Sequence, residues 1–367
     1  MKRRWIALLA FVAITGCGGS GGGQTDERPA VPNPDTADRL AARAANAFLA
    51  TYTTEEGRVE RTDQGSDTVG EGQAYGLLMA AALGREQQFD AIWGWTKRNV
   101  MRPDALLAFR WADGRIQDPQ AAADADLDTV RALLIGACKF DRPQLRGAAR
   151  RIGKAVLRRE TADAAGRPVL LAGPWAAAGG RLTTNPSYLD PATLSALANE
   201  SDDTRYTALA TEGRRIIGSV SAPLPPDWAV VDAASGRAQP VESASSLGGE
   251  GRFTWDAART LVRLAVDPEA AGRRIAARAW PVFADRRPDE IPVEHNLDGT
   301  AAGASRHPVT LVAAAGAATA SGRARRAQQL LAAAEALDRE QPSYYGAAWV
   351  ALGRLLLTTH RLDPTRC

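Results

Sequence analysis

The sequence predicts an all-α fold of about twelve helices. Apolar residues recur at three- and four-residue spacing between about residues 35 and 362, as they do on the buried face of a helix. Alternating strand and helix segments, which build parallel sheets, are missing. The high alanine content suits helices that pack closely against one another. Twelve helices can close into an inner and an outer ring of six or stack as an open solenoid, although no fixed-period repeat is found.

The helices are expected in chain order, mostly joined in pairs by short loops. Thr36 or Asp38 can cap the first helix, which runs to about Tyr52. Its inward face should carry Leu40, Ala44, Ala47 and Phe48. The other helices are expected at residues 71–83, 86–100, 124–140, 143–159, 188–200, 203–220, 254–266, 268–284, 308–320, 322–337 and 343–360. Strand-like segments are few, at 168–171 and 228–231, and longer connections lie at 101–122, 160–187, 221–252 and 286–307.

The first residues resemble an export signal rather than part of the fold. Residues 1–17 combine a basic start, an apolar stretch too short for an ordinary membrane span and the sequence Ile-Thr-Gly-Cys, which looks like a bacterial lipobox. Cys17 would then carry the lipid that anchors an exported lipoprotein to the membrane of the cell envelope. A plain secretory signal with an incidental cysteine is the alternative. Residues 18–35 are rich in Gly, Pro and polar residues and predict a flexible linker, and residues 36–362 form one domain.

Charge and residue counts exclude several classes of function. Lys2, Arg3 and Arg4 account for the whole formal net charge of +3, so the mature chain is neutral and no nucleic-acid partner is indicated. The three histidines are not clustered at the spacing of metal ligands, so no metal site is expected. A serine hydrolase is disfavoured because no Gly-x-Ser-x-Gly turn occurs. Cys138 is most simply a small buried hydrophobe, and a disulfide to Cys367 is permitted but has no support in the sequence.

Three distant segments each contain a carboxylate in a setting suited to cleavage of a glycosidic bond. They are Gly-Glu-Gly-Gln-Ala-Tyr-Gly at 70–76, Asp-Ala-Asp-Leu-Asp at 124–128 and Phe-Thr-Trp-Asp-Ala-Ala-Arg at 253–259. Such cleavage requires one carboxylic acid to protonate the leaving oxygen and one carboxylate to activate water or attack carbon. Each carboxylate taken alone could instead be an ordinary acid at a helix start or half of a surface ion pair.

In order and in flanking residues, these segments resemble glycoside hydrolase family 8, the bacterial endoglucanases and related inverting β-glycanases. The family has Ser-Glu-Gly-Gln-x-Tyr-Gly around its proton donor, Ala-Ser/Thr-Asp-Ala/Gly-Asp around a sugar-binding aspartate and Tyr-Asp-x-x-Arg around its base. Gly70 and Ala123 replace the family's hydroxyl residues. The resemblance extends from about residue 40 to 360 and implies an (α/α)6 barrel of six inner and six outer helices for the 36–362 domain.

The resemblance assigns a role to each carboxylate. Glu71 would be the acid, Asp256 the base, and Asp124 the residue that binds and distorts the sugar at the cleaved bond. A helix N-terminus favours the anionic form of Glu71, so burial or a neighbouring carboxylate would have to raise the pKa of an acid catalyst there. Arg259 lies three residues after Asp256 and could hold its carboxylate, and the flanking Phe253 and Trp255 indicate a buried setting.

Sugar binding is expected from aromatic rings along the cleft. Tyr188 lies in Asn-Pro-Ser-Tyr, a sequence nearly identical in the family, and Tyr345 falls in a paired tyrosine that the family also has. The expected substrate-binding residues are Tyr188, Arg259, Trp175, Phe109, Trp111 and Tyr345.

The resemblance therefore implies an inverting endo-β-1,4-glucanase that acts as a monomer, without a cofactor, on a β-glycan polysaccharide or oligosaccharide. A chitosanase, licheninase or xylanase of the same family is the alternative within the class. A lipoprotein that binds envelope glycan without cleaving it is the alternative outside it.

Overall fold

The computed structural model describes residues 33–246 and 248–366. The predicted signal sequence, the lipidation site Cys17 and nearly all of the linker lie outside the described residues. The described part contains thirteen α-helices, of which α10 (Trp280–Phe283) is a single turn that follows α9. None of the described helices is long and apolar enough to cross a membrane.

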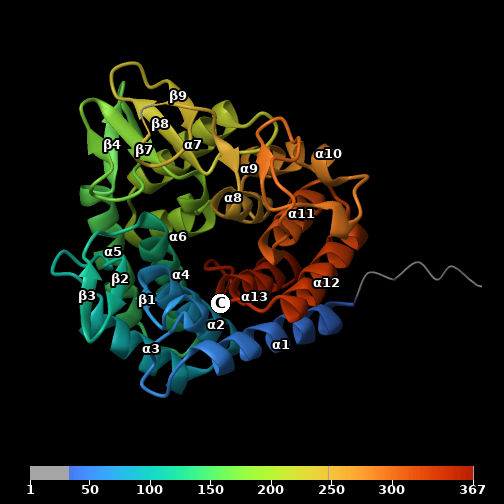
Figure 1. Ribbon diagram of the computed structural model, residues 1–367. Coiled ribbons are helices and arrows are strands. Elements are labelled where there is room, and N and C mark those ends of the chain that lie inside the picture. The colour runs from blue at the N-terminus through green and yellow to red at the C-terminus, as the bar shows by residue number, and fades with distance from the viewer. Residues whose placement is uncertain (1–32, 247, 367) are drawn as a thin grey trace, which may run out of the picture. The chain divides into compact units, whose positions relative to one another are not determined.

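The helices of the described residues form an inner ring and an outer ring that surrounds it (Figure 1). The inner helices are α2 (Gly70–Leu83), α4 (Ala123–Lys139), α6 (Pro191–Ser201), α8 (Trp255–Ala265), α11 (Pro308–Ala320) and α13 (Tyr344–Thr358). Within the ring α2 packs on α4, α4 on α6, α8 on α11, α11 on α13, and α13 on α2. The 3-10 turn η2 (Pro186–Tyr188) packs against both α4 and α8 beside α6. The expected (α/α)6 barrel is confirmed.

The two rings differ in sequence because they differ in burial. Every described residue of α4 from Ala123 to Ala137 is buried, and α11 is almost entirely apolar. The outer helices are amphipathic, and α12 buries only Ala327, Leu330, Leu331, Ala334 and Leu337. The outer helices are α1 (Pro34–Tyr52), α3 (Glu86–Asn99), α5 (Gln144–Arg159), α7 (Arg205–Val220), α9 (Ala270–Arg278) and α12 (Ala324–Glu340).

The predicted helices agree with the structure except in four details. Helix α1 begins at Pro34 with Asn33 as its cap, because the Asn33 side chain accepts a hydrogen bond from the Thr36 amide. Its buried face carries Ala37, Ala41, Ala45, Phe48, Leu49 and Tyr52 rather than the predicted stripe, of which only Phe48 is buried. The helix predicted at 268–284 breaks into α9 and α10, and the one predicted at 188–200 begins only at Pro191, after η2.

Short antiparallel strands occupy the connections that lead into inner helices. The described strands are β1 (Thr68–Val69), β2 (Arg110–Ala112), β3 (Arg115–Asp118), β4 (Thr161–Ala164), β5 (Arg167–Leu170), β6 (Ala177–Ala178), β7 (Arg181–Thr184), β8 (Trp228–Asp232), β9 (Ala238–Val241), β10 (Arg252–Phe253) and β11 (His295–Asn296). They form sheets in the orders β1-β2-β3, β4-β5, β6-β7-β8-β9 and β10-β11. All of them therefore build on the end of the barrel where the inner helices begin.

Cys138 differs from the expectation of a buried thiol. The residue is only partly buried near the end of α4, and it is disulfide-bonded. An apolar helical context predicted burial but carried no information on covalent pairing. Cys367 lies outside the described residues.

Candidate active site

Three carboxylates occupy the same position in three inner helices. Glu71, Asp124 and Asp256 are each the second residue of their helix, α2, α4 and α8. Since the inner helices run in the same direction, their first turns meet at one end of the barrel. The three carboxylates are separated by 53 and 132 residues along the chain. They nevertheless converge in space.

Arg259 of α8 binds all three carboxylates. Its Nη1 lies 2.8 Å from Asp124 Oδ2 and 3.1 Å from Glu71 Oε2, and its Nη2 lies 2.7 Å from Asp256 Oδ1. The guanidinium is 1% exposed, so it is a buried cation shared by three acids. Three negative charges around one positive charge leave a surplus, which favours keeping one of the acids protonated.

Solvent access separates the three acids. The side chains of Glu71 and Asp256 are 20% and 32% exposed, whereas that of Asp124 is 2% exposed. Glu71 and Asp256 can therefore reach a bound substrate and a water molecule, and Asp124 lies below them between α4 and Arg259.

Burial changes the protonation of Glu71. Desolvation, assisted by the negative charges of Asp124 and Asp256, raises the pKa of Glu71 to about 7 against the opposing effect of Arg259. Tyr75, one turn further along α2, donates a hydrogen bond of 3.4 Å to Glu71 Oε2. The pKa of Asp124 is also raised, chiefly by burial. A glutamic acid that is protonated near neutral pH can act as a general acid.

Asp256 is held by donors on both carboxylate oxygens. Arg259 binds Oδ1, and Asn185 Nδ2 donates to Oδ2 at 2.9 Å. Asp227 holds the start of the same helix, since its carboxylate accepts hydrogen bonds from the backbone amides of Thr254 and Ala257 at 3.1 and 2.7 Å. Burial raises the pKa of Asp227 to about 6, with a further contribution from the charge of Asp256. The orientation of Asp256 is thus fixed from two neighbouring loops.

A row of aromatic side chains leads away from the carboxylates on the β6–β9 side. The Tyr188 ring lies 5.3 Å from the Arg259 guanidinium, and Trp228 contacts both Tyr188 and Trp175, with ring centroids 6.2 and 6.5 Å apart. Trp175 is 38% exposed, and its Nε1 donates to Ala121 O at 3.0 Å, just before α4. An exposed indole fixed at its polar edge is a suitable stacking surface for a sugar ring.

The other predicted aromatics divide between the rim and the supporting layer. Phe109 is 41% exposed, and its carbonyl accepts the amide of Gly70, the residue before Glu71. Trp111 is half-buried between Trp95 and the Arg58 guanidinium, so it supports this rim more than it faces a ligand. Tyr345 is partly buried, and its hydroxyl donates to the carbonyl of Trp255 at 3.2 Å.

Two expectations about side-chain environment need correction or refinement. Trp255 is 40% exposed, so it does not bury the Asp256–Arg259 pair as expected, whereas Phe253 is fully buried.

At Gly70, where the family has serine, an added Cβ would lie 3.0 Å from the carbonyl of Ala108 and 3.4 Å from the Ala125 Cβ. The backbone passes so closely there that glycine fits this chain's version of the turn.

A second buried ionic layer lies one helical turn below the carboxylates. Arg263 binds both oxygens of Asp128 at 2.8 Å, and its Nη1 is 3.3 Å from Asp190 Oδ2, which also binds Arg131 at 2.9 Å. Asp128 and Arg263 follow Asp124 and Arg259 at i+4 on the same two helices. This layer joins α4, α8 and the start of α6, and so fixes the separation of the helices that carry the upper layer.

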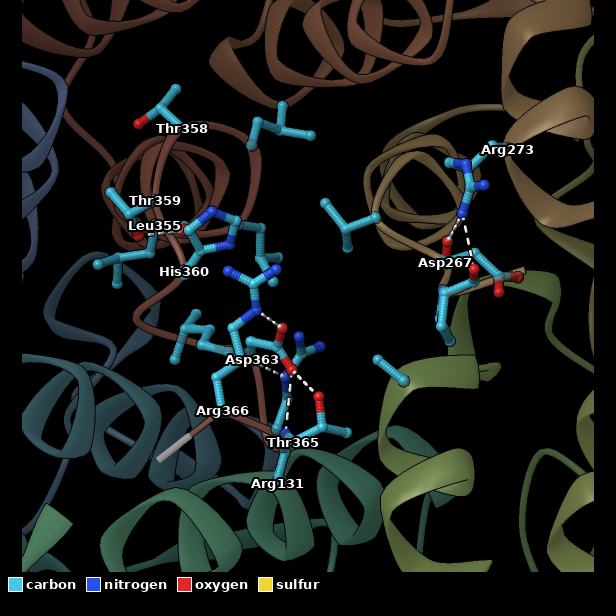
Figure 2. Close-up of a pocket in the computed structure, with 16 residues that line it drawn as sticks. Arg131, Asp267, Arg273, Leu355, Thr358, Thr359, His360, Asp363, Thr365 and Arg366 are labelled. Carbon is cyan, nitrogen blue, oxygen red and sulfur yellow. Dashed lines mark hydrogen bonds and ion pairs between the residues drawn. The ribbon is translucent and has the colours of Figure 1, made fainter. Parts of the chain in front are cut away.

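A pocket of about 460 Å³ at the other end of the barrel does not belong to this site. It is lined by residues at or beyond the ends of α8 and α13, including Asp267 and Thr358. Figure 2 shows Asp363, Thr365 and Arg366 on one side of it and Asp267 with Arg273 on the other. The carboxylates that converge at the helix starts are therefore the better candidate for chemistry.

Three residues of the site were not assigned a role from the sequence. Asn185 lies in the Asn-Pro-Ser-Tyr motif, from which the sequence indicates a role only for Tyr188. Trp228 begins the strand predicted at 228–231 and Asp227 precedes it, and neither lies in a motif. A local signal for Asp227 is absent, because it caps α8 from 27 residues away.

Comparison with known proteins identifies the family to which the chain belongs. The family model described as "Glycosyl hydrolases family 8" matches residues 36–356. A "Probable endoglucanase" of Novacetimonas hansenii is 30% identical over 236 residues, which cover 61% of this chain and 67% of that protein. An "Endoglucanase" of Xanthomonas axonopodis pv. citri is 33% identical over 210 residues, covering 53% of this chain and 54% of that protein. The solved structure of endo-β-1,4-glucanase CMCax from Acetobacter xylinum superposes with a TM-score of 0.74 at 25% identity, covering 91% of this chain and all of that one.

Proposed function

Because this chain belongs to family 8 of the glycosyl hydrolases and is a glycoside hydrolase, we propose that it is an inverting endo-β-1,4-glucanase. The observation that carries the proposal is the convergence of Glu71, Asp124 and Asp256 on Arg259. The curated relatives are matched over 67% and 54% of their own length, and both are named as endoglucanases.

In the proposed reaction Glu71 gives its proton to the glycosidic oxygen as the bond to the anomeric carbon breaks. Asp256 takes a proton from a water molecule, whose oxygen forms the new bond to the opposite face of that carbon. Asp124 lies below these two acids and is almost inaccessible to solvent, so its role in this arrangement is to set the charge around Glu71 and to hold Arg259, rather than the direct contact with the sugar that the resemblance implies. Arg259 and Asn185 keep Asp256 aimed at the water.

The contacts with Arg259 set an upper limit on the separation of the two carboxyl groups, and the product anomer decides between inversion and retention. Glu71 and Asp256 bind neighbouring nitrogens of one guanidinium at 3.1 and 2.7 Å. Their bound oxygens therefore lie no more than about 8 Å apart, a limit that admits both the roughly 5–5.5 Å of retaining enzymes and the lower part of the roughly 6.5–9.5 Å range of inverting enzymes. We expect NMR to detect the α-anomer as the first product from a β-glucan. A first product with retained β-configuration would exclude the mechanism.

The substrate is tested with four polysaccharides in parallel. We expect the release of reducing ends from carboxymethylcellulose to exceed that from chitosan, lichenan and xylan. Preference for one of the other three would assign a different specificity within the family.

Asp256→Asn should release no reducing ends while still binding cello-oligosaccharides, because the amide keeps the shape but cannot accept a proton. Binding without cleavage by the unaltered chain would instead indicate a glycan-binding protein.

We also propose that the protein is an exported lipoprotein and acts as a monomer at the cell envelope. The support is the basic, apolar and cysteine-terminated sequence of residues 1–17, followed by residues 18–35, which are rich in Gly, Pro and polar side chains. Metabolic labelling with a palmitate analogue should mark the wild-type chain and not Cys17→Ser. Labelling of both, or of neither, would contradict the anchor. Light scattering on the purified chain should give the mass of one copy.

A further inference from the structure

Two carboxylic acids behind the active site have no cationic partner. Asp126 lies in the first turn of α4, and Glu160 follows the last residue of α5. Both residues are 0% exposed. Within the described part of the chain, neither forms an ion pair, although most other buried acids bind an arginine. An isolated buried carboxylate is costly, so this pair needs an explanation.

The hydrogen bonds of the pair are incomplete without a proton. Asp126 Oδ1 accepts the Leu107 amide at 2.9 Å. Asp126 Oδ2 and both oxygens of Glu160 receive no donor from the described residues. The two carboxyl groups nevertheless lie within hydrogen-bonding reach of each other. Two ionised carboxylates have only acceptors, so they can bond in this arrangement only when one of them carries a hydrogen.

We propose that Asp126 and Glu160 share a proton and act together as a positioning pair for the active site. Glu160 is the donor, because Asp126 already accepts an amide hydrogen and is best suited to accept a second bond. The pair ties the start of α4, which carries Asp124, to the end of α5. No part of this assignment depends on which glycan is cleaved.

The contact with Leu107 extends the pair's effect to the second catalytic helix. Leu107 lies two residues before Phe109, whose carbonyl accepts the Gly70 amide at 2.9 Å next to Glu71. Asp126 therefore holds the segment from Leu107 to Phe109, which hydrogen-bonds to the start of α4 at one end and to the start of α2 at the other. A change at Asp126 should alter the relative position of Glu71 and Asp124 without removing either.

The surrounding charges make a second ionisation unfavourable. Asp124 and Asp104 add negative potential at the pair, and Arg102 opposes it only partly because it binds Asp104 at 2.9 Å. Burial raises the pKa of both Asp126 and Glu160 well above the ordinary range. Loss of the shared proton would place two adjacent charges directly behind Asp124.

The first test is the pH dependence of stability in Glu160→Gln. Above the ordinary pKa of about 4.5 the unfolded wild type releases the glutamate proton while the folded protein keeps it, so stability falls as pH rises towards the raised folded pKa. The glutamine side chain of the variant donates a hydrogen bond to Asp126 at every pH and lacks this loss. The full-length Glu160→Gln chain should therefore melt about 2 °C or more above wild type at pH 8, with the difference shrinking towards pH 4.

Glu212→Gln is the matched control. Glu212 is also a buried helical glutamate, but it binds Arg215 through both oxygens at 2.6 and 2.8 Å. The same substitution there removes an ion pair and should lower the melting temperature at pH 8. A fall for Glu160→Gln like that of the control, or a difference that does not change with pH, would overturn the shared proton.

The second test concerns positioning and rests on the proposed hydrolase function for its readout. Asp126→Ala leaves the Leu107 amide without its acceptor and should lower kcat/KM by about tenfold or more, mostly in kcat. Asp126→Asn keeps the acceptor, can donate to Glu160, and should restore most of the loss. Equal losses in both variants, or no loss in a folded Asp126→Ala, would refute the positioning role. If the wild type cleaves no glycan, the proposed function fails, while the melting experiment still decides the proton.

Discussion

Replacing Asp124 by asparagine should shift the alkaline limit of activity to lower pH. Glu71 must be protonated to act as the acid, so activity falls as pH rises through its pKa of about 7. Asp124 is one of the negative charges that raise this pKa, and asparagine has nearly the same shape without the charge. The substitution also leaves Arg259 with one fewer carboxylate to neutralise, which lowers the pKa of Glu71 in the same direction.

The size of the shift follows from the shared nitrogen. Glu71 Oε2 and Asp124 Oδ2 bind the same Nη1 of Arg259 at 3.1 and 2.8 Å, so the two oxygens are at most about 6 Å apart. Two unit charges at that distance repel by about 0.7 kcal/mol in bulk water and about 3 kcal/mol at an effective dielectric constant of 20. At 1.36 kcal/mol per pKa unit, the alkaline limit should fall by roughly 0.5 to 2 units.

Tyr75→Phe provides a perturbation of opposite sign. The Tyr75 hydroxyl donates to Glu71 Oε2 at 3.4 Å and so favours the ionised acid. Its removal should raise the pKa of Glu71 and move the limit upward by about 0.5 unit. The assay is the pH profile of kcat/KM on a soluble β-glucan from pH 4 to 9. Shifts of the same sign in the two variants, or no shift in Asp124→Asn, would refute the assignment of the alkaline limit to Glu71.

Three further predictions follow from other contacts of the site and core. Asn185→Ala frees one oxygen of Asp256 and should reduce kcat about 10- to 100-fold with little change in KM, and an effect on KM alone would contradict an orienting role. Trp175→Ala removes an exposed stacking surface and should weaken the binding of cello-oligosaccharides by about 1 kcal/mol, as measured by calorimetry. Unchanged affinity would show that Trp175 does not contact the sugar. His295 is fully buried, its ring nitrogens form no hydrogen bond with the described residues, and burial lowers its pKa to about 4. Below pH 6.5 the unfolded chain binds a proton at His295 that the folded protein does not bind, so the wild type loses stability as the pH falls from 6.5 to 4. The His295→Leu variant should lose up to about 3 kcal/mol less over this range, as measured by urea unfolding.

The sequence predicts the helices of this barrel well because their signal is local. The i, i+3, i+7, i+10 repeat that begins at Leu127 requires only that one face of a helix be buried, and in the structure all of α4 from Ala123 to Ala137 is buried. The same logic misplaces the face of α1. There, alanines at 37, 41 and 45 contact the inner ring, while Leu40 is only partly buried. Small residues at a close helix contact carry no hydropathy signal that distinguishes them from exposed alanines.

The strands were largely missed for a different reason. Pieces of two to five residues, such as β1 and β10, are too short to display a period-two pattern. Some pairing partners are distant, as in β7 with β8, where Leu182 lies opposite Val231, whereas β2–β3, β4–β5, β6–β7 and β8–β9 pair across short turns. Only β5 and β8 contain apolar runs long enough to be recognised. The others contain no apolar run of that length, whether they pair with the next strand or with a distant one.

The site divides in the same way into local and non-local parts. Glu71, Asp124, Asp256 and Arg259 could be selected because each stands in a recognisable motif, and the i to i+3 spacing correctly predicts the contact of Asp256 with Arg259. The same guanidinium also binds Glu71 and Asp124. These contacts could not be predicted, because they depend on how three helices pack. Asp227 could not be found, since its role as a cap arises only where β8 approaches the start of α8.

The opposite roles of Glu71 and Asp256 arise from neighbours and not from helix position. Both are second residues of parallel inner helices, so both experience the same stabilisation of negative charge by a helix N-terminus. Asp256 receives a full-strength donor on each oxygen, from Arg259 and Asn185. Glu71 shares its nitrogen of Arg259 with Asp124 and otherwise receives only a long contact from Tyr75, so desolvation prevails and its pKa rises to about 7. Two carboxylates in equivalent backbone positions thereby acquire the different environments that the proposed base and acid require, and the charge of Asp124 contributes to that difference.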